Sequence, residues 1–304
     1  MTDSSQTRLA YIAESTYGTT PATPAFLEAR FTGEGLNANR ETTTSNEIRA
    51  DRNVTDVIQT GQNAGGSVDI ELSYGSFDDF LESVMFNTWS TNVLKNGTTQ
   101  KSFTFEKTFE AGATDQYHRF TGAVANSLSL SIQAGQLVTG SFDFLANGAS
   151  TGQAIITGAT YTAPNTNDVI NAAASFSALG VTGVTAPEIT ALNLNITNNL
   201  RQQPVVGSLD SRGIGTGRFE VTGDFTAYFA NEELYDLFLA GTATDLTFKL
   251  GGASSKNYVF DMDKIKFESG EIIAGGNDQD VLANMTFRAI FEENDNTLKV
   301  TRTA

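Results

Sequence analysis

The sequence contains no cysteine, so disulfide bonds and metal sites built on thiolates are both excluded. It has one histidine, His118, which leaves a catalytic base or a histidine-rich transition-metal site without its usual residues. Proline is scarce, and no run of apolar residues is long enough to cross a bilayer. The stability of the fold must therefore come from packing, alone or combined with assembly. We expect the chain to be made in the cytoplasm, without insertion into a membrane.

Basic side chains are also few. Lys and Arg number 19 against 35 Asp and Glu, which gives a formal net charge of −16 at pH 7. A protein that grips nucleic acid through its phosphates needs the opposite balance. The charge therefore argues against a DNA-gripping protein and is compatible with a surface that repels DNA.

Small polar residues and phenylalanine are abundant instead, with 28 Gly and 21 Phe in the chain. Residues 66–72 (GSVDIEL) alternate apolar and polar side chains, as a half-buried β-strand does. Large apolar groups among alternating segments are typical of a β core. The sequence therefore predicts an all-β fold with short flanking helices.

The strand pattern occurs twice, in the same order. Residues 66–72 resemble residues 217–223 (GRFEVTG), and a short helix is expected after each. Three further matches are residues 36–40 with 192–201, 102–105 with 245–248, and 132–138 with 267–273. Both members of the last pair are expected to form a strand, a glycine-centred turn and a strand. Each copy also has a long polar excursion before the strand that begins at 66 or 217.

The repeat predicts two tandem β-sandwich domains, over residues 30–147 and 188–304. Residues 1–29 are expected to form an N-terminal arm that lies on a neighbouring subunit. Residues 148–187 are rich in Gly, Ala, Thr and Asn and are expected to connect the domains, with one short strand at 153–156.

Each expected helix has one apolar face. The first, at residues 76–86, has Ser76 as its N-terminal cap. The second, at residues 231–240, has Asn231 as its cap and ends at Gly241. The residues expected on the two buried stripes are Phe80, Leu81, Val84, Leu234, Leu237 and Phe238.

Three patterns resemble sites of chemistry but lack an essential part. His118 lies in an expected strand, away from any nucleophile motif. Residues 213–217 (GIGTG) lack the lysine and the following helix of a phosphate-binding loop. The acidic segments at 261–263, 277–280 and 292–296 lack the spacing of a calcium loop. We therefore predict no enzyme activity, no metal and no cofactor.

Several segments together resemble the major tail proteins of long-tailed bacteriophages, which form the tail tube. They are residues 13–19 (AESTYGT), the strand and helix at 66–86, residues 133–136 (QAGQ) leading into 140–144 (GSFDF), and residues 194–201 (LNITNNLR) with Val206 and Gly207. The resemblance covers most of the chain. No single segment is diagnostic, because the family is defined by a pattern of strands and a helix.

The resemblance implies a structural protein of the virion tail. In this family, β-sandwich domains with one flanking helix join into sixfold rings, and the rings stack into a hollow tube through which DNA passes. If each copy of the repeat takes one place in a ring, three chains close it, and a hexamer of two-domain chains is the alternative. The expected partners are other copies of the chain and the tail tip and tail terminator proteins. DNA is expected to pass through the lumen without specific binding.

Two sets of residues are expected to carry this function. Acidic residues of the alternating strands are candidates for a negative lumen lining: Asp69, Glu71, Asp143, Glu220 and Asp224. Arginines in and beside the polar excursions are candidates for contacts between stacked rings: Arg40, Arg49, Arg52, Arg201 and Arg212. The competing hypothesis is a β-sandwich binding or decoration protein of a virion or cell surface, which would use the same strands and acidic loops for recognition.

Overall fold

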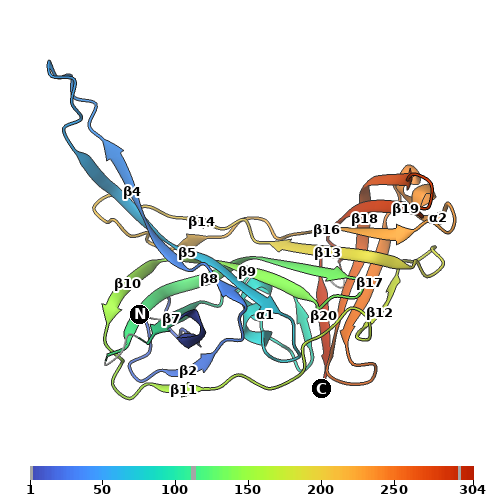
Figure 1. Cartoon of the computed structure of the whole chain (residues 1–304), viewed down its shortest axis with the longest axis horizontal. Helices are drawn as coiled ribbons and strands as arrows, with labels where there is room; N and C mark the ends of the chain where they lie inside the picture. The colour runs from blue at the N-terminus through green and yellow to red at the C-terminus, as the bar shows by residue number, and fades with distance from the viewer. Residues whose placement is uncertain (1–2, 111–113, 294–295) are drawn as a thin grey trace.

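The computed structural model describes residues 3–110, 114–293 and 296–304. Over these residues the chain is mostly β-strand, with two α-helices and one short 3₁₀ helix, η1 (Ser4–Gln6). The prediction of an all-β fold with short helices is therefore confirmed. Figure 1 shows a broad body with a long hairpin projecting from one end and the C-terminal half of the chain at the other.

The first sheet is built by the N-terminal half of the chain. Its strands, in spatial order, are β11 (Thr160–Thr162), β2 (Ala25–Glu28), β1 (Thr7–Ala13), β7 (Phe103–Phe109), the first part of β8 (Gln116–Gln133) and β10 (Gly148–Gln153). Neighbouring strands are antiparallel, apart from the parallel pair β11 and β2.

The second sheet runs through the whole molecule. Its main strands, in spatial order, are β4 (Asn37–Thr44), β5 (Val57–Glu71), β9 (Thr139–Ala146), the second part of β8, β13 (Ile189–Thr197), β16 (Glu220–Tyr228), β19 (Val281–Ala289), β18 (Asn257–Ala274), β17 (Thr244–Gly251) and β12 (Phe176–Gly180). Three short strands extend it: β3 (Gly33–Glu34) beside β5, β20 (Lys299–Thr303) beside β18, and β6 (Val93–Lys95) beside β20. A separate small hairpin consists of β14 (Arg201–Gln202) and β15 (Ile214–Gly215).

Strand β8 belongs to both sheets and bends between them. Gly122 lies at the bend with a φ of +65°, a conformation that glycine adopts without strain. The carboxylate of Glu14 accepts hydrogen bonds from the Gly122 N–H (2.8 Å) and from the hydroxyls of Thr104 (2.8 Å) and Ser102 (2.7 Å). It also accepts one from the N–H of Gly18 (2.7 Å). The segment AESTYGT therefore ties the end of β1 to the bend that carries β8 from one sheet to the other.

Helix α1 (Asp78–Met85) lies between the two sheets and fills the core. All three residues predicted for its apolar stripe are buried: Phe80, Leu81 and Val84. The Phe80 ring centroid lies 4.7 Å from that of Tyr11 in the first sheet and 5.2 Å from that of Phe144 in the second. Such ring pairs contribute beyond the area that they bury, so this side chain joins both layers.

Helix α2 (Glu233–Ala240) is less enclosed than α1. Leu234 is buried, but Leu237 and Phe238 are only partly buried, which corrects the expected stripe. The physical reason is that α2 covers β18 from one side, whereas α1 has a sheet on each side. Gly270 gives α2 room, because a Cβ there would lie 3.0 Å from Cδ1 of Phe238.

Residues 267–273 lie inside β18, so the glycine-centred turn predicted for them is wrong.

The two helix caps also differ from the prediction. The hydroxyl of Ser76 bonds to that of Ser73 (2.6 Å), and α1 has no side-chain cap, so the predicted capping by Ser76 is wrong. In α2 the N-cap position is Glu232, which has no side-chain cap bond, so the predicted cap position is one residue too early. Asn231 still contacts the start of the helix, since its Oδ1 accepts a hydrogen bond from the Glu233 N–H (3.0 Å). Gly241 ends α2 with a φ of +61°.

The two halves of the chain pair their strands in the same order. In the first half the order is β1, β7, β8, β9, β5, β4, and in the second it is β12, β17, β18, β19, β16, β13. Both halves also have a bulge at the corresponding place. The bulge in β8 follows Ala125 and that in β18 follows Phe267, and each of these residues lies opposite a phenylalanine, Phe144 or Phe287.

These bulges align the halves differently from the sequence match. Phe144 also lies opposite Gly66, and Phe287 lies opposite Gly223. Gly66 therefore corresponds to Gly223, six residues beyond Gly217, with which the sequence pattern matched it. The cause is the period of a strand: alternation repeats every two residues, so a shift by an even number preserves both faces.

The halves are joined into one body. Residues 127–133 of β8 pair with 191–197 of β13, and a single apolar cluster contains core residues of both halves. Near the start of α1, the carboxylate of Asp78 accepts a hydrogen bond from the Tyr258 hydroxyl (2.5 Å) and pairs with Arg302. The two domains predicted in tandem thus share a sheet and a core.

The segments expected as arm and connector are also part of this body. Within residues 1–29, β1 and β2 belong to the first sheet, and Leu9 and Ala10 are fully buried, which corrects the expected arm. Within 148–187, β10 and β11 join the first sheet and β12 joins the second. The short strand expected at 153–156 lies earlier, at β10. Polar composition misled for residues 148–187 because β10 and β11 lie at the edges of the first sheet and have no buried residue.

The different enclosure of the two helices leads to a stability prediction. We expect Phe80→Ala to lower the free energy of unfolding by about 3–5 kcal/mol, because it leaves a cavity between two sheets. The matched variant Phe238→Ala should cost clearly less, since its side chain is already partly in water. Urea unfolding of both variants, followed by tryptophan fluorescence and circular dichroism, measures the difference. Equal losses would contradict the burial described for α1 and α2.

Candidate functional site: the polar face of the second sheet

The side of the second sheet that points away from the core is polar. On β5, Val68 and Ile70 are buried, so Ser67, Asp69 and Glu71 point to the opposite side. Strands β9, β8, β13 and β16 continue the same alternation, with their apolar residues in the core. We call the outward side of these five strands the polar face.

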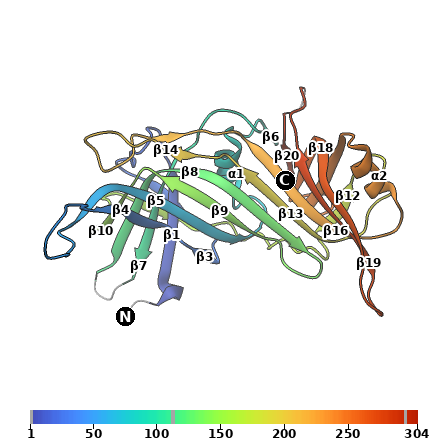
Figure 2. The same cartoon turned by 90° about the horizontal axis from the view of Figure 1, so that it is seen from above.

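Strand pairing arranges the side chains of the polar face in three rows. The first row is Ser67, Asp143, Ser127, Thr197 and Glu220. The second row is Asp69, Ser141, Ser129, Asn195 and Thr222. The third row is Glu71, Thr139, Ser131, Asn193 and Asp224. Figure 2 shows the five strands side by side. The pairing places all five acids named from the sequence on this one face.

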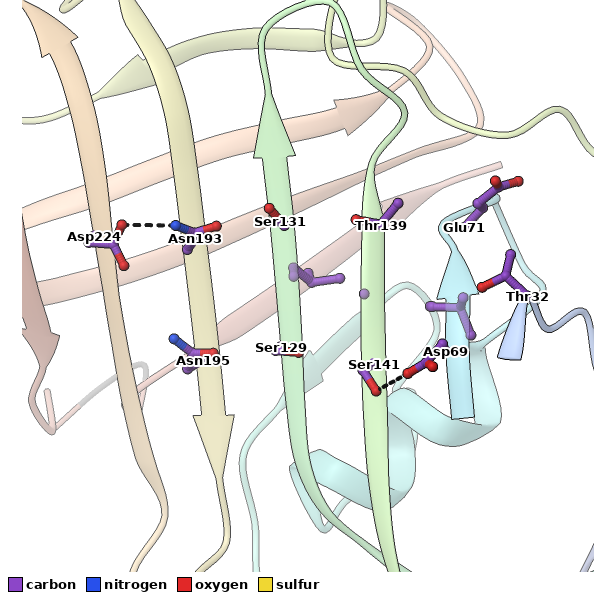
Figure 3. Close-up of a pocket in the computed structure, with 13 residues that line it drawn as sticks. Thr32, Asp69, Glu71, Ser129, Ser131, Thr139, Ser141, Asn193, Asn195 and Asp224 are labelled. Carbon is purple, nitrogen blue, oxygen red and sulfur yellow. Dashed lines mark hydrogen bonds between the residues drawn. The ribbon is translucent and has the colours of Figure 1, made fainter. Parts of the chain in front are cut away.

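The second and third rows line an open hollow of about 570 Å³ (Figure 3). The hydroxyl of Ser141 donates a hydrogen bond to Asp69 (2.5 Å), and the amide of Asn193 donates one to Asp224 (2.9 Å). The rest of the lining is mostly hydroxyl and amide groups of small side chains. Such a surface offers many similar hydrogen-bonding groups and no arrangement that selects one ligand.

Most of the acids have no basic partner. Among the described residues, no Lys or Arg lies within ion-pair distance of these four carboxylates: Asp69, Glu71, Asp143 and Asp224. Glu220 is different, because Arg218 (3.3 Å) and Arg288 (3.8 Å) lie close to it. The negative potential of the polar face therefore comes mainly from these four carboxylates, because the charge of Glu220 is partly neutralised by the two arginines.

His118 is not part of the polar face. It lies on the part of β8 that pairs with β7 in the first sheet. Its ring packs edge-on against Phe109 at a centroid distance of 5.1 Å. Burial, followed by the nearby charge of Lys107, lowers the pKa of His118. No group of three or more metal-ligating side chains occurs in the part of the chain that the structure describes.

The polar excursion after Arg40 is a β-hairpin. Strands β4 and β5 pair from Asn37 opposite Gly65 out to Thr44 opposite Val57, and residues 45–56 close the tip. The hairpin projects far from the body (Figure 1). Its side chains are polar because both of its faces meet solvent, although its backbone is regular.

A second protrusion, residues 201–215 with the β14–β15 hairpin, lies beside the first. The backbone N–H of Gln62 donates a hydrogen bond to the carbonyl of Leu209 (2.9 Å), so the fold brings the two excursions together. The arginines named from the sequence are divided between them. Arg40, Arg49 and Arg52 belong to the β4–β5 hairpin, and Arg201 and Arg212 to the second protrusion.

The tips of the two protrusions carry exposed apolar side chains. Ile48 is 99% exposed and Val54 68%, and Val206 is fully exposed. Beside Ile48, the guanidinium of Arg49 donates two hydrogen bonds to Asp51 (3.0 and 2.7 Å), which lowers the pKa of Asp51 to about 2. Apolar groups grouped on a projection are typical of a protein contact surface.

Two parts of the site were missed by sequence reasoning. The neutral residues between the acids had a signal, because SLSLSIQ (127–133) and LNLNI (192–196) alternate a core residue with a small polar one. The apolar residues of the hairpin tip had no such signal, since their exposure depends on how far the hairpin projects.

Comparison with known proteins agrees with this architecture. Among the described residues, no helix is both long and apolar enough to span a lipid bilayer. A search of curated proteins gave no match. The family model of phage tail tube proteins matches residues 4–289, which is nearly the whole chain and includes both sheets, the polar face and both protrusions. The chain therefore belongs to the phage tail tube protein family, a structural component of the virion tail.

Proposed function

We propose that the polar face lines the bore of the tail tube and that the two protrusions join each ring to the next. The observation that carries this proposal is the polar face itself, a continuous five-strand surface with four acids that have no basic partner in the part of the chain that the structure describes. Double-stranded DNA carries one negative charge per ~1.7 Å of its axis. A wall of carboxylates and small neutral groups gives phosphates nothing to bind, so DNA slides past it.

The chain is a duplicated tube unit, in which each half takes one place in a pseudo-sixfold ring. The identical order of strand pairings and the corresponding bulges in β8 and β18 support this duplication. A closed ring then contains three chains, and six chains per ring is the alternative. Six similar sheet segments around an axis make the polar face a closed inner wall.

The β4–β5 hairpin and the second protrusion supply the axial contacts. Their exposed apolar residues have few contacts within the chain, whereas arginines beside them offer charge pairing to the acidic surface of the next ring. The partners at the two ends of the tube are the tail tip and tail terminator proteins. The role is mechanical, without catalysis or cofactor. The alternative of a binding or decoration protein has no observation that favours it over the tube.

The position of the polar face is tested by thiol labelling. Ser129→Cys introduces a thiol in the middle of the face, in a chain without other cysteines. A maleimide attached to a polymer wider than the DNA duplex should label the free chain quickly and assembled tubes hardly at all, because such a reagent cannot enter a bore that only just admits DNA. The matched variant Ser150→Cys, exposed on β10 of the first sheet, should stay reactive in both states. Rapid labelling of Ser129→Cys in intact tubes would show that the polar face is not the lining.

The axial contacts are tested at the hairpin tip. We expect Ile48→Ser with Val54→Ser to leave the unfolding free energy within about 0.5 kcal/mol, because these side chains are exposed in the free chain. Tube formation should need a higher protein concentration or give shorter tubes in electron micrographs. Asn46→Ser with Asn53→Ser changes the same tip without removing apolar surface and serves as the control. Tubes of normal length from the first variant would exclude the tip from stacking.

The number of chains in a ring is a separate prediction. Native mass spectrometry of isolated rings should give the mass of three chains. Averaged cross-sections of tubes should show threefold symmetry with a weaker sixfold repeat, because the two halves are similar and not identical. A mass of six chains would leave the tube intact and refute the sharing of one ring by three duplicated chains.

A further inference from the structure

One edge of strand β18 has no partner in the described chain. Residues 265–274 pair with β19 on one side, while β20 and β17 pair only with residues 257–265. Glu268, Ser269, Glu271 and Ile273 are exposed along this stretch. We call residues 266–274 the β18 edge. Unpaired backbone groups in such a strand are a template for another strand.

The corresponding edge of β8 is filled within the chain. The bulges align β8 with β18 so that Ser127 corresponds to Ser269 and Ser129 to Glu271. In β8 these positions face β13, which pairs with residues 127–133 in antiparallel fashion. The chain thus contains one complete junction between its halves and one half of a second junction.

The strand that corresponds to β13 lies at residues 33–39. Leu194 of β13 lies opposite Gly223. Glu34 pairs with Val68 and Asn37 with Gly65, so Leu36 lies opposite Gly66, which is the counterpart of Gly223. Leu36 and Asn37 therefore correspond to Leu194 and Asn195, with the same residue types. The two glycines agree as well: a Cβ on Gly66 would meet the carbonyl oxygen of Gly35, and one on Gly223 would meet that of Asn193. Both close contacts occur at corresponding positions.

From this correspondence we infer that the β18 edge binds residues 33–39 of a second copy of the chain, antiparallel, with Glu271 opposite Asn37 and Ile272 opposite Leu36. This inference rests on the proposed ring and specifies its lateral junction. It repeats between chains the register that β8 and β13 use within one chain. In a ring of three chains, the β8–β13 junction within each chain then alternates with the proposed junction between chains. Because both junctions have the same geometry, the contact between chains forms a closed ring.

Electrostatic complementarity agrees with this register. Inside the chain the N–H of Asn198 donates to the carbonyl of Asn126 (2.8 Å), just beyond the paired residues. The counterparts of these two residues are Arg40 and Glu268. Both are exposed and they carry opposite charges, and Glu268 also pairs with Arg288 (2.5 Å), so Arg40 would join an existing ion pair. The external junction therefore brings an arginine to a glutamate where the internal junction has two asparagines.

The strand at residues 33–39 is protected in the free chain by side chains. Oε2 of Glu34 accepts a hydrogen bond from the Leu36 N–H (3.1 Å), and Nζ of Lys107 donates one to the Leu36 carbonyl (3.1 Å). Glu34 and Lys107 also pair with each other (2.6 Å). These groups occupy the backbone sites that Ile272 of a second copy takes in the ring, so they discourage pairing with a wrong strand.

Engineered disulfides test the register directly, because the natural chain has no cysteine. Asn37→Cys with Glu271→Cys places two thiols at a non-hydrogen-bonded pair, where Cα atoms lie about 4.5–5.5 Å apart, within disulfide reach. Assembled tubes of this variant are oxidised and run on a non-reducing denaturing gel. We expect the one-chain band to shift into two- and three-chain bands, with the ladder ending at three.

Two controls make the result specific. Asn39→Cys with Glu271→Cys is two residues out of register, with Cα atoms about 7–8 Å apart, and should stay mostly in the one-chain band. Ser129→Cys with Asn195→Cys is the matched internal pair and should lose its free thiols without changing the number of chains per band.

The outcomes separate the junction from the tube. If tubes form and the internal pair oxidises but Asn37→Cys with Glu271→Cys gives no multi-chain band, the junction is wrong and the tube proposal stands. If the out-of-register pair crosslinks better, the register is wrong. If the natural chain forms neither rings nor tubes under conditions where it stays folded, both the proposed ring and this junction fail.

Discussion

The rest of the structure depends on backbone pairing between β8 and β13. A strand edge must be paired, covered or blunted, because its unpaired N–H and C=O groups otherwise attract other strands. Strand β8 meets this requirement twice: its first part pairs in the first sheet and its second part pairs with β9 and β13. The bend at Gly122, held by Glu14, makes both pairings possible. Since β13 belongs to the second half, this one ladder turns two similar units into one continuous sheet.

The two sides of that sheet have different tasks. On one side, Phe80 and the aromatic side chains around it fill the core, and their burial stabilises the fold. On the other side, carboxylates lie among serine, threonine and asparagine side chains without basic partners, an arrangement that contributes little to stability and that like charges slightly oppose. Such a surface needs an explanation other than the stability of the subunit. The core therefore stabilises a strand arrangement whose outward residues are not needed for packing, which fits the proposed lining of the bore.

The proposed assembly accounts for surfaces that are unfavourable in a free chain. Exposed Ile48 and Val54, and the β18 edge that has no partner among the described residues, are liabilities for aggregation. The side chains of Glu34 and Lys107 cover the complementary strand, and projection of the hairpin keeps its apolar tip away from the body. A protein that polymerises has to keep such surfaces available and still discourage wrong contacts.

The β class, the apolar stripe of α1, the end of α2 at Gly241 and the alternation of polar and apolar sides along each strand could be predicted from the sequence. These are local properties, set by periodicity and by side-chain chemistry within a few residues. Only the tertiary structure decided that Gly66 corresponds to Gly223, that residues 7–28 join the first sheet, that Leu237 and Phe238 stay partly exposed, and that Glu220 lies beside Arg218 and Arg288. The physical reason is that an alternating strand looks the same after any shift by two residues. Its register, its neighbours and the enclosure of a helix are therefore set by contacts between segments that are distant in the chain.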